Sequence, residues 1–268
     1  GSNIAAEGKT KFISPDQNLQ EQGSSLLSYA LNTIYRNFDP KYGGFGYDRK
    51  APNVGAMNFF MRGYNEDLMG DAIGNHRCLE VFSLTLRQTA CSGIHDLIDG
   101  GFHRFTVDWK WRVPHFEKML YDNALFASTY MNASLLSNKK CFENAARDAA
   151  DFMLTDLRSP DGAFYSSLQS DTKEGEGKYY VFSSTELKSC MSADDADWLC
   201  KVLNITPKGN YEGNTSVVSF SAPPEELARQ LNMSYEEFQN KFSGLRAKLR
   251  ELRSKRVKPA QDQSIVCS

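Results

Sequence analysis

Apolar residues recur with helical spacing along most of the first 157 residues. In residues 24–38, Leu27, Leu31 and Ile34 fall on one face of a helix. Pro52 and Pro114 each stand just before another such segment, a position typical of a helix start. The pattern predicts helices over residues 24–38, 53–68, 78–91, 115–136 and 141–157, with further helices around 184–186 and within 193–203 and 223–252.

Short loops that combine glycine with phenylalanine separate these helices. The glycine that opens each loop is Gly43, Gly100 or Gly162, so the loops are 57 and then 62 positions apart. A phenylalanine follows two residues later each time, and helices flank every loop. A recurrence of this length is typical of a repeated helical hairpin rather than an irregular bundle.

Two of the longer loops have the pattern of inserted β-hairpins. Residues 102–113 alternate large and polar side chains, which would place Trp109 and Trp111 on one face. Residues 164–182 contain two aromatic segments joined by an acidic, glycine-rich turn at 171–177. The expected fold is therefore all-α, with two β-hairpin loops inserted between the helices.

Composition excludes several classes of protein. Of 268 residues, 41% are hydrophobic and 24% charged, and the formal net charge is −2, as expected for a globular chain without attraction to nucleic acid. No apolar run has the length of a membrane span. The basic run from 246 to 258 lacks interleaved aromatic residues, so we expect a solvated helix face rather than a nucleic-acid site.

The chain is expected to consist of one principal domain, residues 24–268. Residues 1–23 are expected to be an N-terminal extension, in which Gly1 and Ser2 have the look of a cloning remnant. The six cysteines include no C-x-x-C pair, which favours free thiols over a disulfide framework. We therefore expect a cytoplasmic or mitochondrial location rather than a secreted one.

Two histidines carry the most suggestive chemistry. His115 stands where a helix is predicted to begin, and a helix N-terminus disfavours the imidazolium, so a neutral general base is expected. His103 follows the second glycine-phenylalanine loop. The alternative is structural: His115 caps the helix, and Glu117 pairs with Arg112 or Lys118.

No cofactor or metal is expected from the motifs. His95 and Asp99 are ligand types, but their spacing matches no metal pattern, and the acidic turn lacks the EF-hand spacing. There is no P-loop, no G-x-G-x-x-G and no G-x-S-x-G sequence.

One long block resembles the spermatogenesis-associated, thioredoxin-domain-containing protein family. The block comprises residues 100–108 (GGFHRFTVD), Trp111 and residues 114–124 (PHFEKMLYDNA), and weaker similarity occurs at 42–46 with 51–52 (Ala-Pro), 162–166, 176–182 and 253–259. The resemblance implies an α/α toroid like that of N-acylglucosamine 2-epimerases, with a central cavity for a carbohydrate-like ligand. The residues that match the motif, and are expected to line that cavity, are His103, Arg104, Asp108, His115, Glu117, Tyr121 and Asp122.

The chain departs from the family pattern in three ways. It contains no thioredoxin-like segment. Gln169 stands where the family has an aspartate, which leaves Asp171. Three hairpins are about half of a six-hairpin ring, so the resemblance implies a partial (α/α)6 toroid. We expect an exposed apolar edge that a second copy, another chain or the other half of the ring covers.

Three functions remain open. In the first, a sugar epimerase or isomerase, His115 or His103 removes a proton beside a carbonyl, and Arg104 or Tyr121 stabilises the enolate; activity then requires the other half of the ring. The second is a non-catalytic binding or interaction module. The third is a glycoside hydrolase that uses Glu117 with Asp108 or Asp171. In either carbohydrate reading, Trp109 and Trp111 would stack on sugar rings, with core packing as the alternative.

Overall fold

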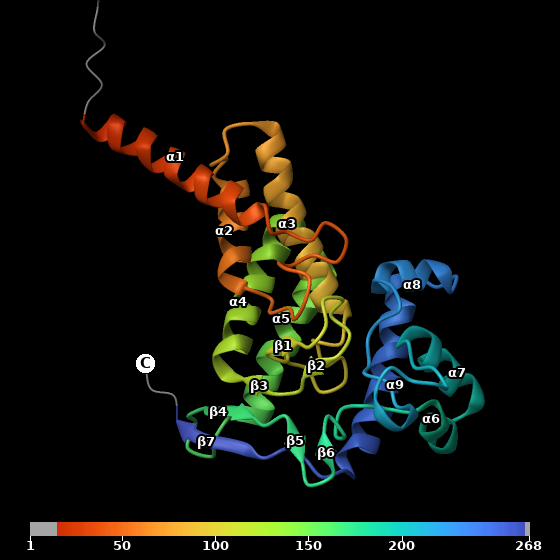
Figure 1. Cartoon of the computed structure of the whole chain (residues 1–268). Coiled ribbons are helices and arrows are strands. Elements are labelled where there is room, and N and C mark those ends of the chain that lie inside the picture. Colours follow the sequence, from red (N-terminus) through yellow and green to blue (C-terminus); the bar gives the residue numbers. More distant parts are fainter. Residues whose placement is uncertain (1–14, 266–268) are drawn as a thin grey trace, which may run out of the picture.

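Helices dominate the structure. The computed structural model describes the backbone of residues 15–265 and the side chains of residues 23–265. Within these residues the helices are α1 (Pro15–Tyr35), α2 (Val54–Asn65), α3 (Ala72–Cys91), α4 (Leu120–Ser137), α5 (Lys140–Phe152), α6 (Ser184–Cys190), α7 (Ala193–Val202), α8 (Pro224–Gln230) and α9 (Tyr235–Ser254) (Figure 1). A π-helical turn, Met153–Leu157, extends α5, and a 3-10 turn spans Glu212–Asn214.

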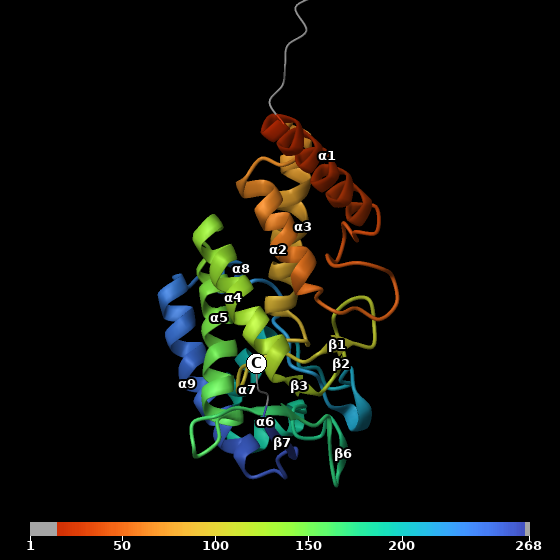
Figure 2. The same cartoon turned by 90° about the vertical axis from the view of Figure 1, so that its left-hand side faces the viewer.

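Helices α2 to α5 form two helical hairpins that stand side by side. Helix α2 packs on α3 and α4 packs on α5, while α2 also contacts α4 and α3 contacts α5. Figures 1 and 2 show the four helices upright, with α1 projecting obliquely from one end. Two of the three predicted helical hairpins are therefore present.

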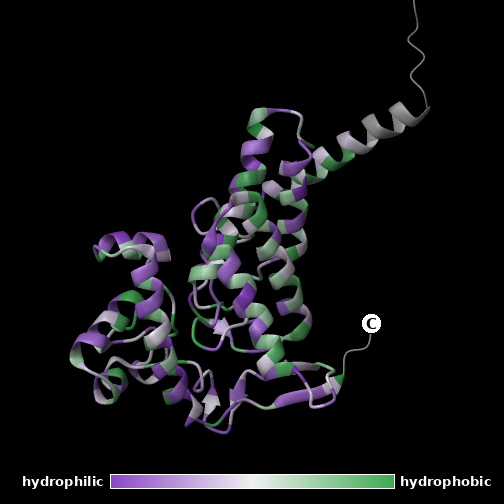
Figure 3. Cartoon of the chain, turned by 180° about the vertical axis from the view of Figure 1, so that it is seen from behind, coloured by the Kyte–Doolittle hydropathy of each residue, from purple (hydrophilic) through white to green (hydrophobic). Residues whose placement is uncertain are grey.

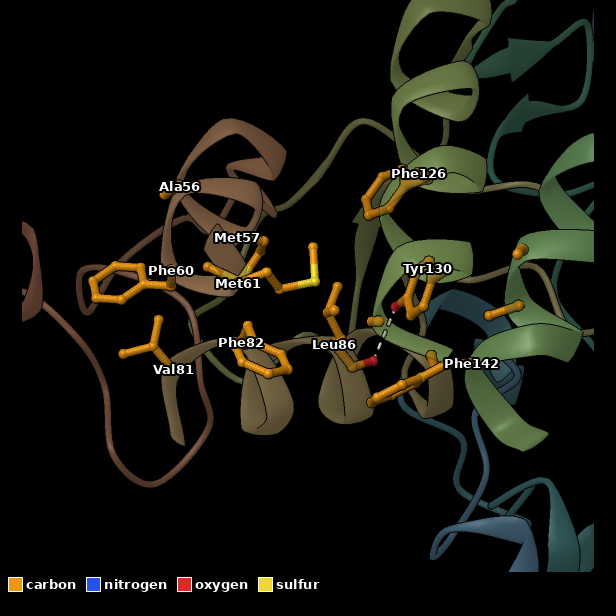
Figure 4. Close-up of a cluster of buried hydrophobic side chains, with 14 of the residues drawn as sticks. Ala56, Met57, Phe60, Met61, Val81, Phe82, Leu86, Phe126, Tyr130 and Phe142 are labelled. Carbon is orange, nitrogen blue, oxygen red and sulfur yellow. Dashed lines mark hydrogen bonds between the residues drawn. The ribbon is translucent and has the colours of Figure 1, made fainter. Parts of the chain in front are cut away.

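Large apolar side chains fill the space between the hairpins. Figure 4 shows Phe60 of α2 and Phe82 of α3 on one side, with Phe126 and Tyr130 of α4 on the other. The Tyr130 hydroxyl is buried, and it donates to the Leu86 carbonyl at 2.9 Å. Burial of each such side chain stabilises the fold by about 1.5–3 kcal/mol.

The repeated loops share one hydrogen-bonding design. In the first loop, the Asp39 N–H donates to the Gly44 carbonyl and the Gly43 N–H donates to the Asp39 carbonyl, both at 2.9 Å. The Lys50 ammonium crosses the loop to the Asp39 carboxylate at 2.5 Å and the Gly43 carbonyl at 2.7 Å. Gly43 and Gly44 have positive φ, so this tight turn requires residues without a Cβ.

The second loop reproduces this arrangement 57 positions later. The backbone bonds link Asp96 to Gly101 at 3.0 Å and Gly100 to Asp96 at 2.9 Å. The Lys118 ammonium reaches the Asp96 carboxylate and the Gly100 carbonyl, each at 2.7 Å. The predicted repeat is thus confirmed. It also contains a buried Asp–Lys pair, which the glycine pattern did not predict.

The third loop keeps the turn without the ion pair. Ser159 takes the place of the aspartate, and its N–H donates to the Ala163 carbonyl at 2.8 Å. Arg158 forms a β-bridge with Phe164, as Phe38 does with Phe45 and His95 with Phe102. The backbone device therefore recurs three times, and the charged pair twice.

Six of the seven short strands in the described residues lie in or next to the two loops that were predicted as β-hairpins. Strand β1 (Phe105–Thr106) pairs with β2 (Pro114–His115). Strand β4 (Tyr165–Leu168) lies between β3 (Lys118–Met119) and the C-terminal β7 (Gln261–Ile265). Strands β5 (Asp171–Thr172) and β6 (Gly175–Glu176) form a small hairpin.

These pairings correct two predictions. The first hairpin exists, but residues 107–113 form its loop rather than a strand, so Trp109 and Trp111 do not alternate along a strand. The second predicted pairing is wrong: the strand at 165–168 pairs with β3 and β7, and not with residues 179–182. Within residues 164–182, the acidic turn closes as a hairpin, through the pairing of β5 with β6.

The helix predicted from residue 115 begins at Leu120. Residues 114–119 instead contribute to two sheets, because β2 pairs with β1 and β3 pairs with β4. His115 therefore lies in a strand and not at a helix N-terminus. Two other helices begin earlier than expected, α1 at Pro15 and α3 at Ala72.

The C-terminal helices α6 to α9 form a module with its own apolar core, built around Phe182, Leu199 and Phe238. The basic run that begins on α9 is only in part the solvated face that was expected: Lys248, Arg250, Lys255 and Lys258 are exposed. Arg253 is 1% exposed and bonds the carboxylates of Asp96 and Asp99. Part of the run therefore joins the module to the helical hairpins.

Apolar and polar residues alternate in both parts of the fold. Figure 3 shows green and purple segments mixed along the hairpin helices and in the C-terminal module. Among the described helices, none is both long and apolar enough to cross a membrane. Helix α4 nevertheless exposes Tyr121, Leu125, Met131, Leu135 and Leu136.

Candidate functional site

A pocket of about 510 Å³ opens where α2, α4 and strand β1 begin, and three predicted site residues line it. We call it the Arg104 pocket. Among the side chains on its wall are Asn53, Val54, Arg104, Phe105, Tyr121 and Asp122. The structure thus brings together three residues that were predicted to face one cavity.

Backbone pairing between distant loops positions Arg104. Its N–H donates to the Glu117 carbonyl at 3.0 Å, next to the β1–β2 pair. The Arg104 guanidinium also donates to the Glu117 carboxylate at 3.3 Å. Glu117, a fourth predicted residue, therefore pairs with Arg104 rather than with Arg112 or Lys118.

The opposite wall comes from the segment that leads into α2. Lys50 and Thr106 exchange backbone hydrogen bonds at 3.1 and 2.8 Å, which fixes this segment beside β1. Asn53 then adopts a left-handed conformation, with φ 48°, and the chain turns into α2. Asparagine tolerates this region better than most residues.

Asp122 is the acidic side chain among the residues that line this pocket. It occupies the first turn of α4, and its Oδ2 atom is buried without a hydrogen-bond partner. Burial raises the pKa of Asp122 to about 6, and Glu117 contributes in the same direction, while Arg104 opposes both. A carboxyl group of this kind exchanges protons near neutral pH.

Arg104 remains cationic beside this carboxyl group. Tyr121, Glu117 and Asp122 raise the pKa of Arg104, against the effect of partial burial. Its side chain is about half exposed, so it can meet a solute in the pocket. The pocket therefore combines a fixed cation, a phenol and a proton-exchanging carboxyl group.

His115 lies behind the wall of the pocket. Its ring stacks on Phe105, with centroids 5.0 Å apart, and Phe105 lines the pocket. The Nδ1 atom is 2.9 Å from the Glu176 carboxylate, which accepts the hydrogen bond when Nδ1 carries the proton. The Nε2 atom is then the basic atom, so a His–Glu pair, and not a helix terminus, sets the chemistry of His115.

His103 is enclosed in the protein interior. It is 2% exposed and packs edge-to-face with Phe116 and Tyr180. Burial, together with the Lys118 charge, holds the pKa of His103 well below its usual value, so the ring is neutral. A neutral ring was expected, and so was a place on the cavity wall, but the buried His103 is not among the residues that line the Arg104 pocket.

The other predicted binding residues lie apart from this pocket. Asp108 accepts hydrogen bonds from the N–H groups of Lys110, Arg112 and Val113, so it shapes the β1–β2 loop. Trp109 packs edge-on against Tyr42.

Trp111 belongs to the core rather than to an open face. It is 0% exposed, and its indole N–H donates to the Tyr42 carbonyl at 2.8 Å. Asp171 is exposed on β5, away from the lining of the Arg104 pocket. Of the two tryptophans, only Trp109 retains a surface for stacking.

Sequence reasoning missed the wall formed by residues 49–55 and by Phe105. The weak signal was Ala51-Pro52, which belongs to a segment that resembles the family, although the resemblance gave it no role. In the described part of the chain, no group of three His, Cys, Asp or Glu side chains is arranged to hold a metal ion.

The fold and pocket define a protein of paired helices with small inserted β-structures. No family model matches the sequence. Solved structures with a similar arrangement include a cellobiose 2-epimerase from Bacillus thermoamylovorans (10% identity, TM-score 0.45, 91% of this chain and 77% of that one). A sugar epimerase from a ruminal bacterium is similar at 12% identity and a TM-score of 0.43, over 91% of this chain and 76% of that one.

The sequence relationship is more particular. The chain is a distant homologue of spermatogenesis-associated protein 20, and the resemblance found in the sequence is confirmed. It is 27% identical to the human protein over 280 residues, which cover 94% of this chain and 35% of the relative. The mouse protein is 30% identical over 183 residues, 66% of this chain and 23% of the relative. The chain thus spans about a third or less of the length of these relatives.

Proposed function

We propose that the Arg104 pocket is a proton-transfer site for a small carbohydrate-like ligand, as in a sugar epimerase or isomerase. The observation that supports this most directly is Asp122, whose pKa of about 6 occurs beside Arg104 in an open pocket. At neutral pH this group is mostly a carboxylate, yet it is a stronger base than an ordinary aspartate.

The reaction that suits these groups is removal and return of a proton beside a carbonyl. The Asp122 carboxylate accepts the proton from the ligand carbon, and the electron pair of the broken C–H bond moves to the carbonyl oxygen. The Arg104 guanidinium and the Tyr121 hydroxyl stabilise the resulting negative oxygen. Return of the proton to either face, or to the neighbouring carbon, gives an epimer or an isomer.

The walls of the pocket suit a sugar. Phe105, Leu125 and Pro52 offer apolar surface, while Asn53 and Arg49 offer hydrogen-bonding groups. A ring with one apolar face and a polar rim needs this combination. We propose that the hairpins form part of a toroid, that full activity requires the longer protein, and that the Arg104 pocket of this chain alone retains slow proton exchange.

Isotope exchange tests the proposal directly. The chain is incubated with glucose, mannose and N-acetylglucosamine in deuterated buffer, and proton NMR follows the signal at C2. We expect slow loss of that signal, with a rate that rises through about pH 6 as Asp122 loses its proton. Asp122→Asn should abolish the exchange, and Asp161→Asn, at an exposed position in the third loop, should not.

His115 is the second candidate for the base, because its pair with Glu176 leaves one ring nitrogen free. Loss of exchange in His115→Gln, with exchange retained in Asp122→Asn, would transfer the role to His115. Sugar binding without exchange in the wild-type chain would favour the non-catalytic alternative. Absence of both binding and exchange would contradict the proposal.

The hydrolase alternative has less support. Asp108 is engaged by the backbone, and Asp171 lies on a separate hairpin. Glu117 therefore has neither of its predicted partners free beside the Arg104 pocket. Release of reducing sugar when a disaccharide is incubated with the chain would instead favour the glycoside hydrolase.

A further inference from the structure

A second pocket lies where the C-terminal module meets the helical hairpins. It measures about 260 Å³ and is bounded by the end of α3, by α5 and by α9. We call it the His95 pocket. Figure 2 shows α9 alongside α5, and the Arg246 guanidinium joins them by donating to the Asp148 carboxylate at 2.8 Å. None of its lining residues belongs to the Arg104 pocket.

His95 presents an unpartnered nitrogen in this pocket. The side chain is 3% exposed and stacks on Phe102, with centroids 4.3 Å apart, so its ring plane is fixed. Its Nδ1 atom is 2.9 Å from the Ala90 carbonyl, which can only accept, so Nδ1 carries a proton. The other ring nitrogen, Nε2, is buried and has no hydrogen-bond partner.

Asp148 places a carboxylate oxygen close to Nε2. The Asp148 Oδ2 atom is 3.4 Å from Nε2, without the geometry of a hydrogen bond. Burial acts to raise the pKa of Asp148, but His95 and Arg246 outweigh it and hold the carboxyl group ionised. Nε2 and Oδ2 thus lie close together without a hydrogen bond between them, and a bound group with neighbouring hydroxyls would satisfy both atoms.

The charge and shape of the pocket narrow the class of ligand. Arg147 and Arg246 balance Asp148 and Asp151 on its wall, so a net charge on the ligand gains nothing. The rings of Phe220 and Phe242, 5.1 Å apart, supply an apolar side. The volume would hold roughly eight waters at ~30 Å³ each, which is space for one sugar ring.

We propose that the His95 pocket binds a small neutral polyhydroxyl compound, such as a monosaccharide or cyclitol. Neighbouring hydroxyls donate to His95 Nε2 and to the free oxygen of Asp148, while the C–H face of the ring rests on Phe220 and Phe242. This site is distinct from the Arg104 pocket and does not depend on proton transfer there. Because its walls come from both parts of the fold, an occupied pocket also holds the C-terminal module against the hairpins.

The imidazole nitrogens report on the site directly. The ¹⁵N-labelled chain is titrated with glucose, myo-inositol and glycerol, and long-range proton–nitrogen spectra follow His95. We expect a saturable shift of Nε2 with glucose or inositol and a smaller one with glycerol. The exposed His76 serves as the internal control and should not shift.

Two variants of α9 separate this site from any other. Ser243 is an exposed residue that lines the pocket, so Ser243→Phe should block it and weaken binding at least tenfold without disturbing the core. Ala247→Phe, one turn further on and outside the lining, should change binding by less than about twofold. Asp122→Asn should leave the His95 response intact, so failure of one proposal does not imply failure of the other.

Three outcomes would overturn the proposal. The first is absence of a saturable His95 shift with every polyol, including the case in which His95 is doubly protonated at neutral pH and forms a simple ion pair with Asp148. The second is a shift that survives Ser243→Phe. The third is a response to an organic cation such as ethylammonium in place of the polyols.

Discussion

Asp122 stands in the first turn of α4, where a helix N-terminus stabilises an anion, yet burial raises its pKa to about 6. The fold therefore holds an ionised Asp122 at neutral pH at a cost in stability. Such a cost is typical of a group kept for its chemistry rather than for packing. It also has a measurable consequence.

We expect Asp122→Asn to stabilise the chain, and more so at high pH. A folded pKa above the unfolded one means that the fold favours the protonated form, so wild-type stability falls as pH rises from about 4 to about 6 and then stays level. The amide escapes this loss. Allowing for solvent screening of a partly buried group, the gain near pH 8 is on the order of 1 kcal/mol, or roughly 2–4 °C in Tm.

Thermal melts of both proteins near pH 4.5 and pH 8 measure the effect, and Asp161→Asn provides the control. An equal change in Tm at both pH values would contradict the assignment of the raised pKa to Asp122.

The buried Asp–Lys pairs of the repeated loops offer a matched comparison. Lys50→Met leaves Asp39 buried without its cation, which should cost about 3–5 kcal/mol. Lys118→Met should cost less, because Arg253 still bonds both oxygens of Asp96. Urea unfolding measures both free energies, and a second substitution, Asp39→Asn, should recover part of the Lys50→Met loss.

This comparison also has a pH dependence. Burial alone would raise the pKa of Asp39, but Lys50 and the N–H groups of Lys41 and Tyr42 hold it below its usual value. The pair therefore contributes its stability above about pH 4, and the contribution is lost as pH falls through the folded pKa. The loss in Lys50→Met should shrink in acid, and a loss that is constant with pH would argue against the ion pair as its cause.

At the scale of elements, the sequence correctly predicted those helices and turns whose structure depends on neighbouring residues. Helices α2, α5 and α7 lie close to their predicted positions because their apolar residues keep the helical period. The repeat was visible because each turn needs glycine at positive φ, as at Gly43, Gly100 and Gly162. These features depend on neighbours in the chain.

The failures arise from long-range contacts. Residues 114–119 look like the start of a helix, but Lys118 is drawn to Asp96, and β3 pairs with β4 about fifty positions away. Pairing of β2 with β1 took His115 out of its predicted helix. Within the candidate site, Arg104, Tyr121 and Asp122 came together as expected, whereas only the tertiary fold revealed that His103 and Trp111 are buried.

Helix α9 joins the two parts of the molecule through its arginines. Arg253 donates to Asp96, to Asp99 and to the Tyr180 carbonyl, from a fully buried position. Arg250 contacts the Ile98 carbonyl but is about half exposed. We expect Arg253→Met to cost about 3–5 kcal/mol and Arg250→Met about 1 kcal/mol or less.

Hydrogen exchange distinguishes loss of this junction from general destabilisation. In Arg253→Met, amides of α9 should lose protection before those of α3 and α5, because the C-terminal module detaches first. Uniform loss of protection across both parts would mean that the junction does not limit the stability of the module.

At the scale of the whole molecule, α4 leaves an apolar face in solvent. Leu135 is 78% exposed and Leu125 is 49% exposed, with Tyr121, Met131 and Leu136 on the same helix. The relatives extend well beyond the matched region, since this chain covers 35% of the human protein. We propose that other helices or another copy cover this face, as expected for an incomplete ring.

The chain alone should therefore self-associate through α4. Contiguous exposed apolar surface on a helix drives association unless charge opposes it, so Leu125→Lys combined with Leu135→Lys should shift the chain toward a monomer. Leu154→Lys, at a residue of similar exposure on the π-helical turn, should leave association unchanged. Sedimentation velocity over a wide concentration range measures the change. A wild-type chain that stays monomeric at every concentration would mean that α4 needs no partner.

Association that persists in the double variant would place the contact elsewhere, and the exposed Leu26 and Tyr29 of α1 are then the next face to test.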